Sequence, residues 1–213
     1  DITESTPCGY WEGVYTSKSP AEVSWYQARP EVSLGLIDAT GVGKDAHILD
    51  VGGGASTLVD QLLAAGYTSL SVLDISQAAL AHARARLGDE ARRVEWVAAD
   101  ITRYRPSAPV GLWHDRAVLH FLTAVADQQA YADVLRTSVN PCGWAIIAGF
   151  APGGPLRCSG LDIIQHDANS LGALLGDEFR LVDIRDEFHR TPSGTHQAFR
   201  YHLFRRSETP AHS

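Results

Sequence analysis

A run of three glycines directly after a short apolar segment constrains this chain more than any other feature. The apolar segment covers residues 47–51, and Gly52, Gly53 and Gly54 follow it. From residue 56 to residue 65 apolar side chains recur at helical spacing. A strand that turns through glycines into a helix lets a ligand approach the backbone closely. The sequence therefore predicts a ligand site at the end of the first strand of an α/β sheet.

The same alternation of strand and helix patterns continues toward residue 150. Further strands are expected at 70–74, 94–98, 110–114 and 144–150, and helices at 77–87 and 126–139. Strands that are apolar along most of their length are typical of a parallel sheet covered on both faces.

Beyond residue 170 the pattern changes. A short helix at 170–175 precedes two segments, 179–184 and 198–204, in which apolar and polar residues alternate. The turn-rich stretch 191–195 joins them, which indicates an antiparallel hairpin. The predicted fold is therefore an α/β, Rossmann-like, doubly wound sheet of seven mostly parallel strands with a C-terminal antiparallel hairpin.

Carboxylates stand where the first three predicted strands end, at Asp50, Asp74 and Asp100. Asp74 lies at the position where an acid can bind a ribose hydroxyl pair. Asp50 discriminates between cofactor classes, because a carboxylate there repels a pyrophosphate but favours the ammonium and sulfonium of S-adenosylmethionine. Thr57 stands where the dinucleotide loop has its third glycine, which also argues against NAD.

The segments "LDVGGGAS", "VLDIS" and "AADI" carry a family resemblance. In order and spacing the chain from about 47 to 150 resembles the class I S-adenosylmethionine-dependent methyltransferases, although Ser56 replaces a glycine common in that family. The resemblance implies that the cofactor is S-adenosylmethionine. The resemblance also implies that Asp50, Gly52 and Gly54 bind the methionine part, Asp74 the ribose, and Asp100 with Ile101 the adenine. Gly53 and Ile75 are further expected cofactor-binding residues.

The stretch "WHDRAVLHFL" at 113–122 resembles the Asp-Arg segment of the thiopurine and thiol S-methyltransferases. Some protein-lysine methyltransferases have Asp-Lys-Gly at this place, and Ala117 departs from the glycine usual in both groups. Asp115, His114 and His120 are the candidates for a base, and Asp115 and His120 are the predicted catalytic residues. Asp115 is also a candidate cofactor contact, and the alternative for His114 is a satisfied core residue. The alternative for Asp115 is an ion pair with Arg116. Cys158 and His166 are candidate substrate contacts.

The N-terminal stretch is rich in aromatic residues, which suit a sulfonium cation and help to exclude water. Trp11 and Trp25 are therefore expected to contact the cofactor; the alternative is that they pack a helix on the sheet. The expected organisation is an N-terminal aromatic-rich lid or helical extension at 1–35, an S-adenosylmethionine-binding domain at 36–206 and a tail at 207–213.

Composition limits the partners. The net charge of −7 disfavours a nucleic-acid substrate, and no apolar run is long enough to cross a membrane. The acidic N-terminus does not look like a signal peptide, and three cysteines without a zinc or redox spacing favour free thiols, a cytoplasmic location and no metal. The oligomeric state stays open.

These observations predict an S-adenosylmethionine-dependent methyltransferase that acts on a small molecule, with a thiol or similar soft nucleophile as the favoured acceptor. A protein-lysine N-methyltransferase is the first alternative. An NAD(P)-dependent reductase and a non-catalytic cofactor-binding protein are alternatives from other classes.

Overall fold

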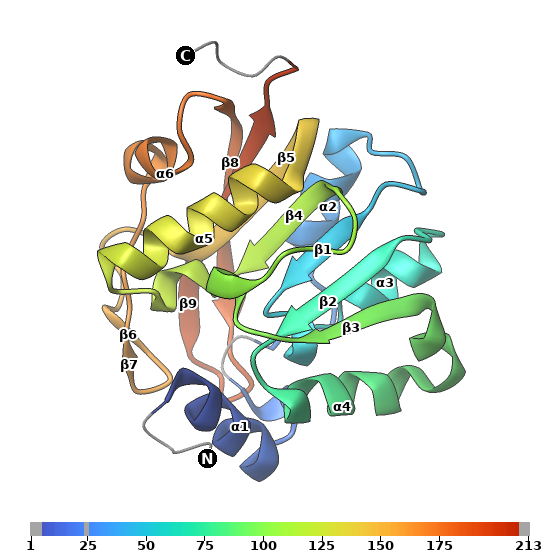
Figure 1. The fold of residues 1–213 in the computed structure, drawn as a ribbon. Coiled ribbons are helices and arrows are strands. Elements are labelled where there is room, and N and C mark those ends of the chain that lie inside the picture. The colour runs from blue at the N-terminus through green and yellow to red at the C-terminus, as the bar shows by residue number, and fades with distance from the viewer. Residues whose placement is uncertain (1–5, 24–25, 209–213) are drawn as a thin grey trace.

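The computed structural model describes residues 6–23 and 26–208 (Figure 1). Seven strands form one sheet in the order β3-β2-β1-β4-β5-β9-β8. The strands of this sheet are β1 (Ile48–Val51), β2 (Leu70–Asp74), β3 (Val94–Ala98), β4 (Val110–Arg116), β5 (Val139–Phe150), β8 (Phe179–Arg190) and β9 (His196–Arg206). The helices are α1 (Pro7–Ser17), α2 (Glu31–Thr40), α3 (Leu58–Ala64), α4 (Gln77–Leu87), α5 (Val125–Ser138) and α6 (Ala168–Leu175).

Strands β1 to β5 pair in parallel, whereas β9 pairs antiparallel with both β5 and β8. The predicted doubly wound sheet with a C-terminal hairpin is therefore confirmed. The chain order reverses between β1 and β4, and a crevice forms at such a reversal, at the carboxyl ends of the strands. The glycine loop, which includes a 3-10 turn over Gly53–Ala55, leaves β1 at this crevice.

Helices cover both faces of the sheet. Buried residues of α2, α3 and α4 pack on one face, and those of α5 and α6 pack on the other (Figure 1). Side chains along each strand alternate between these faces, so Ile48 and Leu112 belong to the first core and Leu49 and Trp113 to the second. This alternation decides which polar residues at the strand ends can meet.

Local signals set several helix boundaries. The Ser76 hydroxyl accepts from the Ala79 amide at 3.1 Å and caps α4, which ends at Gly88 as its pattern predicts. Helix α6 begins at residue 168, two residues earlier than expected, because Asp167 forms a capping box with Ser170.

Two features were not expected from the sequence. Strand β5 begins at Val139, so residues 140–143 belong to a strand and not to a loop. A small ribbon of β6 (Arg157–Cys158) and β7 (Leu161–Asp162) follows β5 and lies near α1 (Figure 1).

The expected boundary at 35/36 falls inside α2, which runs from Glu31 to Thr40.

Candidate active site

A cavity of about 530 Å³ lies at the carboxyl ends of the central strands, and residues of α1 form part of its wall. Its volume suits a drug-sized ligand or a nucleoside cofactor. Six of the expected cofactor-binding residues line it: Trp11, Gly52, Asp74, Ile75, Asp100 and Ile101. Trp25 lies outside the described residues.

The glycine loop is tightly enclosed. Gly52 has a φ of 71°, and a Cβ atom there would lie 2.2 Å from Cγ2 of Val118. A Cβ on Gly53 would lie 2.2 Å from Oδ2 of Asp50. Side chains are therefore excluded at both positions, and the loop presents bare backbone to the crevice.

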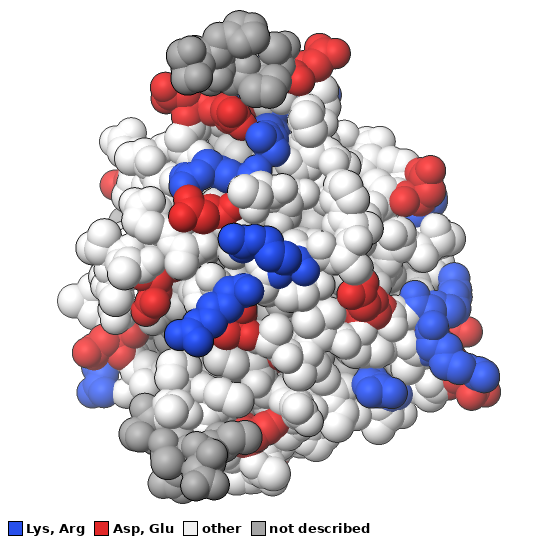
Figure 2. Space-filling view, in the orientation of Figure 1, with Lys and Arg blue, Asp and Glu red and all other residues white. Residues whose placement is uncertain are grey.

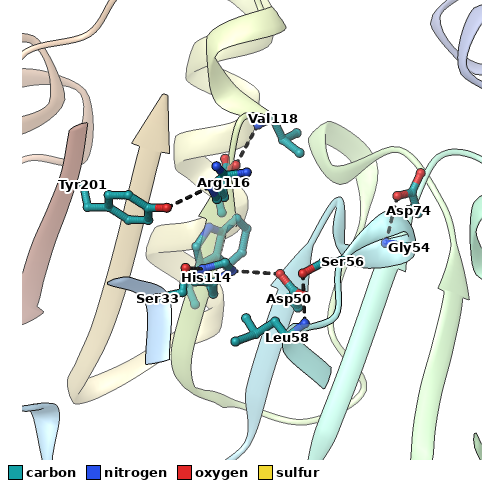
Figure 3. Close-up of polar contacts among 12 residues, drawn as sticks. Ser33, Asp50, Gly54, Ser56, Leu58, Asp74, His114, Arg116, Val118 and Tyr201 are labelled. Carbon is teal, nitrogen blue, oxygen red and sulfur yellow. Dashed lines mark hydrogen bonds and ion pairs between the residues drawn. The ribbon is translucent and has the colours of Figure 1, made fainter. Parts of the chain in front are cut away.

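Asp74 ends β2 and holds the loop in place. Its Oδ2 accepts from the Gly54 amide at 3.1 Å, and its Oδ1 accepts from the Ser76 amide at 2.9 Å (Figure 3). Burial, with smaller contributions from the nearby Asp50 and Glu12 carboxylates, raises the pKa of Asp74 to about 6. Each carboxylate oxygen can accept a second hydrogen bond, so the ribose hydroxyls can bind here.

Asp100 follows β3. Its Oδ1 accepts from the Thr102 amide at 2.9 Å and from the Thr102 hydroxyl at 2.7 Å. Both bonds use Oδ1 and start the 3-10 turn over Ile101–Arg103. The carboxylate and the buried Ile101 side chain thus line the cavity together, as an adenine site requires.

Asp50 lies beside the main cavity, in a recess of about 30 Å³. Gly52 and Arg116 line both spaces. Asp50 Oδ1 accepts from His114 Nδ1 at 2.8 Å, whereas Oδ2 is buried and has no hydrogen-bond partner among the described residues. A carboxylate and a guanidinium in one recess match the ammonium and carboxylate of an amino acid, so these residues fit the methionine part of the cofactor.

Arg116 ends β4 on the α2 side of the sheet. Its Nε donates to the Tyr201 hydroxyl at 2.8 Å (Figure 3). Its guanidinium lies 3.3 Å from Glu187 and 4.0 Å from the Phe199 ring centroid. The expected alternative of an ion pair with Asp115 is not observed, because successive strand residues face opposite sides.

The structure does not bring Asp115 to the cavity. The side chain is fully buried on the α5 face, where it accepts from the amides of Val118 at 2.7 Å and Leu119 at 3.0 Å and from the Tyr131 hydroxyl at 2.5 Å. Burial raises its pKa to about 6, although the Tyr131 hydrogen bond opposes this shift. Asp115 thus fixes the turn after β4 and does not line the cavity.

His120 also lies behind the cavity wall. It is 3% exposed, and its ring packs 4.3 Å from that of Phe121, which does line the cavity. Burial lowers the pKa of His120 to about 3, helped by the positive charge of Arg116 and by His166. His166 lines a small separate cavity with His120, and Cys158 is buried in β6, so neither expected substrate contact lies on the main cavity.

Helix α1 supplies the expected Trp11 and, besides it, Tyr10 and Glu12, which the sequence analysis did not single out. Trp11 packs edge-on against Phe121 at 5.1 Å, and Tyr10 donates to the carbonyl of Ser159 beside β6. Glu12 accepts from the Ala78 amide at 2.6 Å at the start of α4. These contacts fasten α1 to both sides of the cavity. Only the aromatic richness of the stretch signalled this role.

Comparison with known proteins agrees with this geometry. Residues 48–143 match the family model of a methyltransferase domain. The N-methyltransferase NodS from Bradyrhizobium japonicum WM9 is 18% identical, with a TM-score of 0.65, and the match covers 84% of this chain and 96% of that one. The 1,6-didemethyltoxoflavin-N1-methyltransferase of Burkholderia thailandensis is 22% identical, with a TM-score of 0.66, and the match covers 93% and 84%.

A third similar structure was described in work on the conversion of a disulfide bond into a thioacetal group during echinomycin biosynthesis. It is 20% identical, with a TM-score of 0.72, and the match covers 97% of this chain and 95% of that one. The search of curated proteins found no match. The chain thus contains a match to a methyltransferase domain over residues 48–143, and its fold is the one that solved S-adenosylmethionine-dependent methyltransferases share. Two of the similar structures hold a cofactor of this class: NodS was solved with S-adenosylhomocysteine, and the magnesium protoporphyrin IX methyltransferase of Synechocystis PCC 6803 was solved with S-adenosylmethionine.

Proposed function

We propose that the chain transfers a methyl group from S-adenosylmethionine to a small molecule whose acceptor is a thiol or a similarly soft nucleophile. The observation that carries this proposal is the aromatic wall of the cavity, formed by Tyr10, Trp11, Tyr15 and Phe121. Sulfur packs favourably against aromatic rings, and such a wall also excludes water from the reacting atoms.

The chemistry requires little of the protein beyond positioning. Bound S-adenosylmethionine supplies an electrophilic methyl group, and the acceptor must lie in line with it. No histidine or lysine is among the described residues that line the cavity. A thiol ionises close to neutral pH, so it depends less on a base than an amine or a hydroxyl does.

One similar protein supports a sulfur acceptor, because the match that concerns a disulfide-to-thioacetal conversion involves sulfur chemistry. The toxoflavin-type match, an N-methyltransferase solved with its small molecule bound, supports only the small size of the acceptor. The charges on the face in Figure 2 also suit a small acceptor better than a nucleic acid, because Lys and Arg side chains are interspersed with Asp and Glu there. Among the described helices none is long and apolar enough to span a bilayer.

A specific observation favours a second candidate. Asp127 in the first turn of α5 and Asp162 in β7 also line the cavity. Carboxylates there attract a cationic acceptor, which suits a small amine or a protein lysine.

The test is a screen with methyl-labelled S-adenosylmethionine. Small thiols, amines and carboxylates are offered separately, and native and denatured protein extracts are offered in parallel. We expect label on thiols, identified as an S-methyl product by mass spectrometry. Label only on amines, or only on extract proteins, refutes the thiol proposal. Cofactor binding without transfer to any acceptor indicates a non-catalytic binding protein.

The Asp74→Asn variant gives the background level of label transfer in this screen, because it lacks a carboxylate that lines the cofactor cavity. Phe121→Ala tests the aromatic wall. If the wall binds the acceptor, this variant raises the KM for the thiol more than the KM for the cofactor.

A further inference from the structure

Three buried polar side chains form a hydrogen-bonded chain from helix α2 to the glycine loop (Figure 3). Ser33 Oγ lies 2.9 Å from His114 Nε2, and His114 Nδ1 lies 2.8 Å from Asp50 Oδ1. The three residues are 0%, 3% and 4% exposed. Ser33 is therefore closed to any substrate, and the chain of residues does not act as a nucleophilic triad.

The fold explains why these residues meet. Asp50 and His114 are register partners on the parallel strands β1 and β4. Both side chains point to the face that α2 covers, and Ser33 lies on the buried side of that helix. The contact thus depends on strand pairing and on the packing of α2.

The hydrogen bonds fix the tautomer of His114. A carboxylate only accepts, so Nδ1 carries the proton and donates it to Asp50. In the neutral imidazole, Nε2 then accepts from the Ser33 hydroxyl. The imidazole is held at both ends, and it holds the Asp50 carboxylate by one oxygen.

The other oxygen of Asp50 has no such partner. Oδ2 is buried, lies against Gly53 in the recess that Arg116 also lines, and has no hydrogen-bond partner among the described residues. Buried polar atoms in folded proteins are almost always hydrogen-bonded, so a buried carboxylate oxygen without a partner indicates that a ligand supplies the donor. The ammonium of the cofactor's methionine part is a donor of matching charge.

We propose that His114 and Ser33 are positioning residues for the cofactor: they hold Asp50 by Oδ1 so that Oδ2 receives the ammonium group. This proposal depends on S-adenosylmethionine as cofactor and is independent of the acceptor. Neither residue touches the reacting atoms. Their effect appears in the recognition of the amino-acid part alone.

The test compares two ligands by calorimetry on the full chain. S-adenosylhomocysteine carries the amino-acid part, whereas 5′-methylthioadenosine has the same nucleoside and sulfur but no amino acid. His114→Leu removes both hydrogen bonds, and we expect it to weaken S-adenosylhomocysteine binding about tenfold to hundredfold. Binding of 5′-methylthioadenosine should stay within about twofold, which also shows that the variant is folded.

Two milder variants grade the effect. His114→Asn keeps a donor near the position of Nδ1 and should restore part of the lost affinity. Ser33→Ala removes one hydroxyl and should weaken S-adenosylhomocysteine binding only about threefold. His47→Leu is the matched control. His47 immediately precedes β1, at the end of that strand opposite to the glycine loop, and bonds to Ser71. This variant should not change the ratio of the two affinities.

The proposal is overturned if His114→Leu weakens both ligands equally, or if it leaves both unchanged. It is also overturned if the ¹⁵N spectrum of the ligand-free protein places the His114 proton on Nε2. If neither ligand binds the unaltered chain, the cofactor assignment itself fails. A chain that binds both ligands but methylates no thiol refutes only the proposed acceptor.

Discussion

Replacing Tyr131 by phenylalanine removes one hydroxyl group from the fully buried network beneath the turn after β4. That hydroxyl donates to Asp115 Oδ2 at 2.5 Å and accepts from Trp113 Nε1 at 3.0 Å. A hydrogen bond to a charged group contributes about 1.5–3 kcal/mol, and a buried donor left unpaired costs about 1–3 kcal/mol. The expected loss of unfolding free energy is therefore about 3–5 kcal/mol, since the phenyl ring keeps the packing.

Urea unfolding and a thermal melt measure this loss. For a chain of 213 residues, each kcal/mol of lost unfolding free energy lowers Tm by about 2–4 °C, so Tm should fall by about 6–20 °C. Tyr67→Phe is the matched control. Tyr67 is 5% exposed, and its ring lies under the Lys44 ammonium at 4.0 Å, so its substitution should change the unfolding free energy by less than about 1 kcal/mol.

The same variant tests whether Asp115 takes part in catalysis. The Tyr131 hydrogen bond lowers the pKa of Asp115, so its loss raises that pKa above its present value of about 6. If Asp115 acts only on the turn, the pH profile of turnover stays in place at a temperature where the variant is folded. An unchanged unfolding free energy together with a displaced pH profile would refute the structural role and restore Asp115 as a catalytic group.

Three further predictions concern the site. Gly52→Ala should weaken S-adenosylhomocysteine binding at least about tenfold, because its Cβ meets Val118 at a φ of 71°, whereas Gly13→Ala, with open space around it, should have no effect in calorimetry. Because the pKa of Asp74 is raised to about 6, cofactor affinity should fall as the pH drops through 6, by up to about tenfold per pH unit. The same pH dependence in an Asp74→Asn variant would contradict this prediction. His120 has a pKa lowered to about 3, so the unfolded chain binds the extra proton between pH 6.5 and 3, and the stability that neutral His120 provides is complete above pH 6.5 and is lost toward acid. The unfolding free energy of the unaltered chain should therefore decline relative to His120→Asn by up to about 1.4 kcal/mol per pH unit below 6.5, and a constant difference would disprove the buried neutral state.

The sequence predicted the parts of the site that depend on strand ends. Asp74 and Asp100 each follow a strand, and the carboxyl ends of neighbouring parallel strands meet at one edge, so their placement needs no knowledge of distant packing. The glycine loop follows from the same local pattern. Residues tied to strand ends by position alone were therefore well predicted.

The residues at the carboxyl end of β4 show where this reasoning stops. Whether Asp115 or His114 faces α2 depends on the phase of the strand and on which strands pair, and the pattern of a short apolar run does not reveal either. Glu12 contacts the start of α4, and Tyr10 contacts the turn between β6 and β7, through long-range docking of α1 that no local signal encodes. The capping of α6 by Asp167 was readable in the sequence, but the helix was predicted to start at residue 170.

Strand β4 serves two compartments with consecutive residues, because Trp113 and Asp115 anchor the α5 core while His114 and Arg116 serve the recess beside the cofactor cavity. Deleting or inserting one residue within β4 would exchange the two sets and send every one of these groups to the wrong compartment. We expect point substitutions along this strand to be tolerated in graded fashion and length changes not at all. The fold therefore depends on the number of residues in β4, which sets the face of the sheet to which each side chain points, more than on any single side chain of the strand.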